Sequence, residues 1–176
     1  MTKGSGNWDE MPIFNDIKPC VFKDGTVNYY LQKNNFNFKE DGTPSVLTGE
    51  DGDVMIEFHK FGYKITREGN YLYIDLTNDE NAEGYCYDAF SRLTEGDLDY
   101  FYQGAYKGYI DDNGDLRSIA GVLPTANKNI VEFRTAAQKR NIVGDESNAY
   151  HYQQSTYAHL VALQCLYFMK YGNLNG

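Results

Sequence analysis

The chain has 176 residues, of which 41% are hydrophobic and 23% are charged, and this balance excludes global disorder. The formal net charge of −9 disfavours nucleic acid as a partner, because an acidic surface repels phosphate backbones. The cysteines Cys20, Cys86 and Cys165 lie far apart, which suits neither a disulfide framework nor a zinc ribbon. The longest apolar run, Tyr157 to Met169, is too short to cross a bilayer as a helix, so we expect a soluble protein without membrane insertion.

The first half of the chain contains two hairpin patterns. Apolar runs between Ile17 and Tyr30 flank Asp24-Gly25, which is a signal for a tight turn. Breaker residues then predict a loop over 39–53. Apolar residues alternate from Val54 to Ile65 and again from Leu72 to Leu76, with turn residues between them, so a second hairpin is expected here.

A third hairpin is predicted in the second half. Residues 78–99 are acidic and weakly patterned, and we expect mostly loop there. Residues 100–110 and 116–122 are expected to be paired strands. Asn113-Gly114 between them suits a tight primed turn, in which both central residues have positive φ.

The last part of the chain changes to helical periodicity. Ile130, Phe133, Ala136 and Ala137 recur at three-and-four spacing, and either Asn127 or Asn129 can cap this helix. A second helix is predicted from a cap at Ser155 to Lys170, ending at Gly172. It is apolar on almost every side, so we expect it to be buried on almost every side.

Strands that precede two helices predict an α+β fold. We expect residues 1–12 to be a flexible tail and residues 13–176 to form a single α+β domain.

Candidate metal and catalytic residues are few. The acidic turn with Asp111, Asp112 and Asp115 could offer oxygen ligands to calcium, but it lacks the spacing of a helix–loop–helix calcium site, so a plain turn is favoured. Asp51 and Asp53 are weaker candidates for calcium binding. We expect no cofactor.

The histidines and cysteines form no recognisable catalytic motif. His59 is expected on the exposed face of its strand, His159 as a hydrogen-bonded core residue, and His151 has no assigned role. Cys165 lies in the apolar helix, where a thiol is usually inert, although a Cys–His nucleophile pair stays open as an alternative. The basic cluster of Arg134 with residues 138–140 is expected to be the solvated face of a helix.

Sixteen tyrosines suggest a binding surface. Tyr100, Tyr102 and Tyr106 fall on one face of the predicted strand, and tyrosine rings suit sugar stacking and protein interfaces. We treat these three residues as a candidate ligand-binding platform, with a core and subunit-contact role as the alternative.

Several stretches together resemble one protein family. They are CVFKDGTVNYYL (20–31), EDGTPSVLTGEDGDVMIEFHKFGYKI (40–65), FYQGAYKG (101–108), LRSIAGVLPTANKNIVEFRTAAQKR (116–140) and LVALQCLYFMKYGNL (160–174). They are similar to tail-associated structural proteins of phages and prophages of Gram-positive bacteria. The resemblance implies a C-type-lectin-like fold, in the branch shared with formylglycine-generating enzymes. It also implies that the fold is incomplete at the C-terminus, where the family continues into strands that carry the enzyme branch's catalytic cysteines.

The resemblance implies a non-catalytic component of a virion, associated with a tail or fibre and used in host adhesion. Expected partners are other virion proteins, a bacterial cell-surface glycan or protein, and further copies of the chain, with a trimer favoured. The alternatives are a carbohydrate-binding module that uses the tyrosine platform and an enzyme of the formylglycine-generating type.

Overall fold

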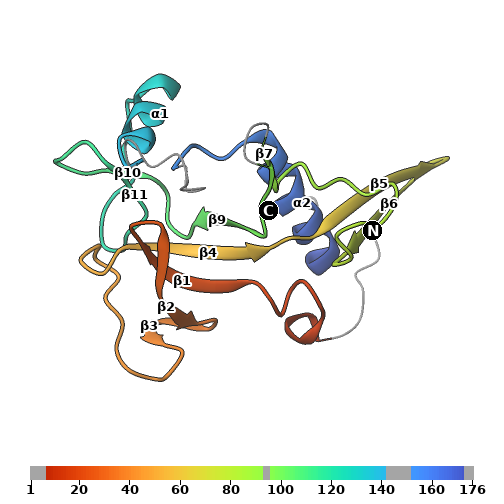
Figure 1. Ribbon diagram of the computed structural model, residues 1–176, viewed down its shortest axis with the longest axis horizontal. Coiled ribbons are helices and arrows are strands. Elements are labelled where there is room, and N and C mark those ends of the chain that lie inside the picture. Colours follow the sequence, from red (N-terminus) through yellow and green to blue (C-terminus); the bar gives the residue numbers. More distant parts are fainter. Residues whose placement is uncertain (1–6, 93–95, 142–151, 173–176) are drawn as a thin grey trace. The chain divides into compact units, whose positions relative to one another are not determined.

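The computed structural model describes residues 7–92, 96–141 and 152–172 (Figure 1). The chain divides into two compact units, each built from separate stretches of sequence. The first unit comprises Met1–Ile17, Phe58–Phe101 and Ser155–Gly176, and the second comprises Lys18–Glu57 and Tyr102–Gln154. The fold is α+β, as predicted: antiparallel strands precede two helices. Its relation to C-type lectins stays a prediction.

A five-stranded sheet has the order β3-β2-β1-β4-β9. Its strands are β1 (Lys18–Lys23), β2 (Thr26–Gln32), β3 (Asn35–Lys39), β4 (Asp53–His59) and β9 (Tyr100–Gly104). The predicted hairpin at Asp24-Gly25 is confirmed, because Lys23 pairs with Thr26 and both turn residues have positive φ, 48° and 83°. The loop predicted after β3 is also confirmed, with one isolated bridge between Phe38 and Pro44.

The second predicted hairpin is formed by β5 (Gly62–Glu68) and β6 (Tyr71–Thr77), which pair in register along their whole length. Strand β4 ends at His59, so the apolar run from Val54 to Ile65 is two strands rather than one. The described residues between 78 and 99 are mostly loop, as expected, with the short pair β7 (Ser91–Arg92) and β8 (Gly96–Asp97).

The prediction of a third hairpin is wrong in its extent. Strand β9 ends at Gly104, and only β10 (Tyr109–Ile110) and β11 (Leu116–Arg117) pair across the acidic turn. The primed turn is also wrong, because only Gly114 has a positive φ, at 80°. The Asp111 carboxylate accepts from the backbone N–H groups of Asn113 and Asp115, both at 3.0 Å, and so stabilises a longer turn.

Both helices begin at capping boxes. Helix α1 (Ile130–Gln138) starts after Asn129, whose side chain accepts from the N–H groups of Val131 and Glu132. Helix α2 (Tyr157–Tyr171) starts after Thr156 and not after Ser155 as predicted, and it ends at Gly172 in the left-handed conformation, φ 58°. A short 3₁₀ helix, η1 (Trp8–Glu10), lies within the segment expected to be a tail.

Helix α2 is fully buried on one face, half-buried at its sides and exposed on a fourth set of positions, so the prediction of burial on nearly every side is wrong. Ala162, Cys165 and Leu166 are buried, whereas the Tyr157 side chain is 81% exposed. Leu160 and Tyr171 are also exposed. The apolar composition of this helix therefore supplies one core-facing face and an uncovered apolar surface.

Each unit has its own apolar core. In the first unit, the rings of Phe58 and Phe101 stack at 4.8 Å, and Phe90 packs against Phe61 and Phe101. In the second unit, a buried cluster of Val21, Leu31 and Val54 joins β1, β2 and β4. These cores fix the strands that carry the polar residues described next.

Candidate functional site

The buried polar groups of the second unit are centred on strand β4. Asp53 and Glu57 lie four residues apart on this strand, and their exposed fractions are only 1% and 2%. Burial of a carboxylate costs folding free energy unless it is paired or hydrogen-bonded. The partners of Asp53 and Glu57 therefore determine which roles these side chains can have.

Glu57 is held by tyrosines from two other strands of the sheet. The Tyr102 hydroxyl donates to Glu57 Oε2 at 2.8 Å, and the Tyr30 hydroxyl lies 3.2 Å from both carboxylate oxygens. The Phe22 ring packs on the Tyr102 ring at 4.5 Å. Burial and the nearby Glu57 charge raise the pKa of Cys20 to about 12. This thiol is therefore protonated at neutral pH and is a poor nucleophile.

The three platform tyrosines have different surroundings. The Tyr100 side chain is 41% exposed, and its ring meets the edge of His59 at 4.5 Å. Tyr102 is half-buried over Glu57. Tyr106 lies beyond the end of β9 and packs against the buried cluster of Val21, Leu31 and Val54, which we call the Val21 cluster. The structure therefore does not place Tyr106 on the strand. Tyr100 is therefore the most exposed residue of the candidate site, which itself stays a prediction.

Asp53 is the centre of an ion-pair network that sequence reasoning missed. Its Oδ1 accepts from Arg117 Nε at 3.0 Å and from the Ser118 backbone N–H at 2.8 Å, and its Oδ2 pairs with Arg140. Gly52, which precedes Asp53, lets the chain pass close to β1, because a Cβ at that position would lie 2.4 Å from the Phe22 carbonyl oxygen. We call Asp53, Arg117 and Arg140 the Asp53 cluster.

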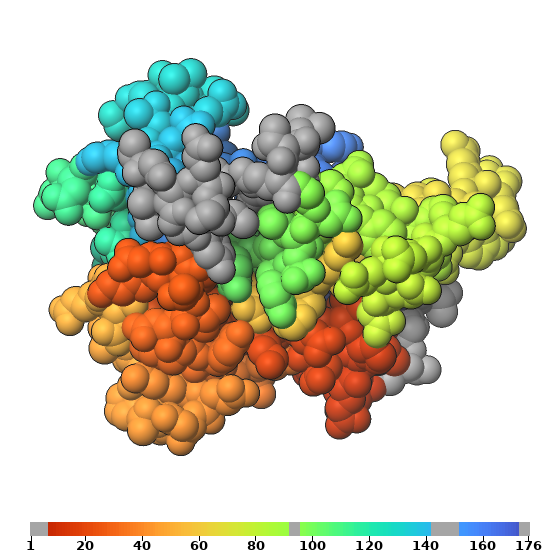
Figure 2. All heavy atoms as spheres, in the orientation of Figure 1, coloured from red at the N-terminus to blue at the C-terminus, as the bar shows by residue number. Residues whose placement is uncertain are grey.

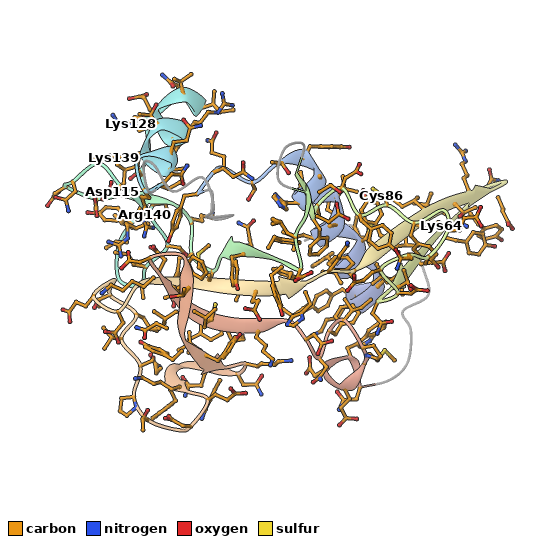
Figure 3. The ribbon with its side chains drawn as sticks, viewed as in Figure 1. Lys64, Cys86, Asp115, Lys128, Lys139 and Arg140 are labelled. Atoms are coloured by element: carbon orange, nitrogen blue, oxygen red, sulfur yellow. The ribbon has the colours of Figure 1, made fainter. Side chains whose placement is uncertain are left out.

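Arg140 corrects the expectation of a solvated basic face. Arg134, Gln138 and Lys139 are exposed as expected, but Arg140 follows the end of α1 and its side chain is 14% exposed. Its guanidinium lies over the Tyr152 ring at 4.2 Å, and it donates to the Leu116 carbonyl at 3.1 Å. Figure 3 labels Arg140 and Lys139 near the end of α1.

The acidic turn supplies internal partners. Asp111 Oδ2 lies 3.5 Å from Arg117, and Asp115 lies 3.5 Å from Lys139. Burial alone would lower the pKa of Arg117, but Asp53 and Asp111 outweigh it and raise that pKa. Asp112 is exposed. Among the described residues, no group of three or more His, Cys, Asp or Glu side chains is placed to hold a metal ion.

The cysteines and histidines take packing and capping roles where they are described. Burial raises the pKa of Cys165 to about 11, and the Cys86 thiol lies 3.3 Å from the Tyr63 hydroxyl. His159 is the third residue of α2, where its Nδ1 accepts from the Thr156 N–H. His59 is half-buried rather than exposed. His151 lies outside the described residues.

The sequence carried no signal for the Asp53 cluster, because its arginines lie 64 and 87 residues from Asp53.

No protein-family model, curated protein or solved structure matches the chain. No helix in the described part of the chain is both long and apolar enough to span a membrane.

Proposed function

We propose that this chain is a non-catalytic structural component of a bacteriophage virion, associated with a tail or fibre and used in host adhesion. The observation that carries the proposal is the resemblance of five ordered stretches, between residues 20 and 174, to phage tail-associated proteins. The proposed partners are other virion proteins, copies of the same chain, and a glycan or protein on the bacterial surface.

The roles of the polar residues support a structural function. Asp53 binds two arginines, Glu57 binds two tyrosines, and the thiols of Cys20 and Cys165 have pKa values far above neutrality. Groups in such surroundings stabilise a fold and are poorly suited to acid–base or nucleophilic chemistry. The uncovered apolar side chains of α2 support contacts with other chains in a particle.

Binding of the labelled protein to cells and walls from a panel of Gram-positive bacteria tests the adhesion role. We expect saturable binding to a narrow set of strains. Uniform lack of binding to every strain would contradict adhesion by this chain. Turnover of cell wall or of a thiol substrate by the purified protein would contradict the non-catalytic role.

A second candidate function, saccharide binding, is favoured by the exposed ring of Tyr100. The best test is Tyr100→Ala, because Tyr102 and Tyr106 also support the fold and their removal would confuse the result. We expect Tyr100→Ala to reduce glycan binding while Tyr157→Ala, the matched change at a tyrosine that is 81% exposed, leaves it unaltered. Equal binding by both variants would rule out the platform.

A further inference from the structure

The β5–β6 hairpin is a two-stranded ribbon whose outer sides differ. On the outer side of β5, the Tyr63 backbone exchanges two hydrogen bonds with Cys86, at 3.1 and 2.8 Å, so this side is occupied at the base of the ribbon. The outer side of β6 pairs with no other strand in the described part of the chain. Figure 1 shows both strands running together to the turn at Gly69-Asn70, and in Figure 2 the yellow and yellow-green atoms of the ribbon lie on the visible surface.

The pairing of the ribbon determines which backbone groups of β6 face outward. Glu68 pairs with Tyr71 across a two-residue turn, so Tyr71 and every second residue after it direct their backbone N–H and C=O groups toward β5. Leu72 and Ile74 therefore direct theirs away from β5. Among the described residues, these outward groups have no hydrogen-bond partner. An open row of this kind is a template for another strand.

The part of β6 next to the turn also exposes apolar side chains. The exposed fractions are 71% for Tyr71, 60% for Leu72 and 48% for Tyr73, and Ile74 is half-buried. The two tyrosines lie on one face of the ribbon and the two aliphatic residues on the other, because alternate residues of a strand point to opposite faces. Exposed apolar side chains beside unpaired backbone groups favour the addition of a strand.

Charge favours a second copy of the chain as the added strand. The whole chain carries −9, so two copies repel each other over most approaches. The ribbon contains two basic and two acidic residues and is neutral, so two copies can meet here without that repulsion. An antiparallel pair about a two-fold axis presents the same row of groups to each partner, so the open groups of one copy match those of the other.

We infer that β6 pairs with β6 of a second copy of this chain, in antiparallel orientation about a two-fold axis at Tyr73. In this register Leu72 of each copy faces Ile74 of the other, and the outward groups of both residues form four backbone hydrogen bonds. The two Tyr73 rings lie side by side at the axis as a cross-strand aromatic pair. On the opposite face, the leucines and isoleucines of both copies form one aliphatic cluster.

Asp75 is the only charged residue of β6, and it determines the register. With the axis at Tyr73, each Asp75 faces Tyr71 of the other copy, and the two carboxylates lie about 14 Å apart along the strands. Moving the axis by one residue away from the turn halves this distance, and moving it by two places the carboxylates directly opposite each other, which is destabilising. Moving the axis by one residue toward the turn brings the turn residue Asn70 into the pairing.

The contact creates a four-stranded antiparallel sheet with the order β5-β6-β6-β5, and it covers the side that a single copy leaves open. It gives a dimer, whereas the trimer that the resemblance favours would need a different, three-fold contact. The inference rests on the self-association included in the proposed function. Its test uses purified protein without cells, so its failure is distinguishable from failure of the adhesion role.

The first test uses proline to block the open side of β6. Leu72→Pro removes one outward N–H from each copy, and so two of the four intermolecular bonds, but no bond within the hairpin. We expect the dimer dissociation constant to rise about ten-fold or more. Arg67→Pro, the matched change on the outer side of β5, should leave it unaltered. Light scattering measures the mass, which rises from the monomer value of 20.1 kDa toward twice that value, and circular dichroism checks that both variants are folded.

The second test reads the register by disulfide capture with oxidised glutathione. In Tyr73→Cys the two new thiols face each other at the axis, where the Cα atoms of a non-hydrogen-bonded pair lie about 4.5 Å apart, within the range of a disulfide. We expect a covalent dimer that reductant dissolves. Tyr71→Cys is the matched control, because its thiols would lie about 14 Å apart along the strands and should not join.

A wild-type protein that stays monomeric over the concentration series overturns the inference, and a strand of another virion protein then becomes the candidate occupant. Trimers overturn it as well, and so does a Leu72→Pro variant that is folded and dimerises like the wild-type protein. Capture of Tyr71→Cys in place of Tyr73→Cys overturns the proposed register.

Discussion

Removal of the Asp53 charge should destabilise the second unit strongly. In Asp53→Asn the side chain keeps its size, but Arg117 and Arg140 lose the carboxylate whose negative charge balances both guanidinium groups. Loss of one member of a buried ion pair costs about 3–5 kcal/mol. The Arg117 and Arg140 side chains are 20% and 14% exposed, so water partly solvates their charges after the substitution. We therefore expect a loss of unfolding free energy at the lower end of this range, about 3 kcal/mol.

The free energy of unfolding is measured by denaturant titration followed by far-UV circular dichroism. Tryptophan fluorescence is less suitable, because the single tryptophan, Trp8, lies in the other unit. The matched control is Asp97→Asn, which removes a pair with Lys60 at 2.9 Å in which the Asp97 side chain is 54% exposed. We expect a much smaller effect there, because water screens exposed pairs.

A double-mutant cycle separates the ion pair from a general loss of packing. If Asp53 and Arg140 act on each other, Arg140→Gln should cost less in the Asp53→Asn background than in the wild-type protein, by about 0.5–3 kcal/mol. A cost below about 1 kcal/mol for Asp53→Asn would refute the reasoning, since typical surface substitutions cost about 0.5 kcal/mol or less. Strict additivity in the cycle would refute it as well.

Three further changes test the polar core and the helix cap. Tyr102→Phe removes a hydrogen bond to the buried Glu57 carboxylate and should lower the free energy of unfolding by about 1.5–3 kcal/mol, measured by denaturant titration. Asn129→Ala removes the cap of α1 and should cost about 1 kcal/mol in the same assay, whereas Asn129→Gly should cost only a few tenths. The Cys20 pKa of about 12 lies above its ordinary value of 9.0, so only the unfolded state ionises between these pH values. Stability should therefore be unaffected by this group below pH 9 and fall above it by at most about 1.4 kcal/mol per pH unit, and Cys20→Ala should show a smaller alkaline loss in thermal unfolding.

Local sequence signals predicted the elements whose geometry depends on neighbouring residues. The turn at Asp24-Gly25 and the β5–β6 hairpin follow from turn chemistry and period-2 alternation, which act over a few residues. The cap at Asn129 was one of two predicted alternatives, and its capping box with Glu132 decides between them. These parts of the fold could be derived without knowledge of tertiary contacts.

Features that depend on distant residues could not be predicted in this way. The pattern predicts a solvated face for Arg140, because helical spacing contains no information on a carboxylate 87 residues away. The strand predicted through Tyr106 ends at Gly104, because Tyr106 instead packs against the Val21 cluster. The end signals of α2 predicted the helix, but its apolar composition did not predict its burial, which depends on how many neighbours the chain supplies.

The two buried carboxylates on β4 bear most directly on the choice between an enzyme and a structural protein. A pair of acidic side chains is the usual equipment of sugar hydrolysis, which needs one carboxylate that can hold a proton and another that stays ionised at the substrate. Here Asp53 is compensated by two arginines and Glu57 is bound by two tyrosines, and neither side chain is more than 2% exposed. A substrate would have to displace these partners before it reached either carboxylate. The same contacts attach β9, β11 and the residue that follows α1 to β4, so Asp53 and Glu57 hold the polar part of the second unit together.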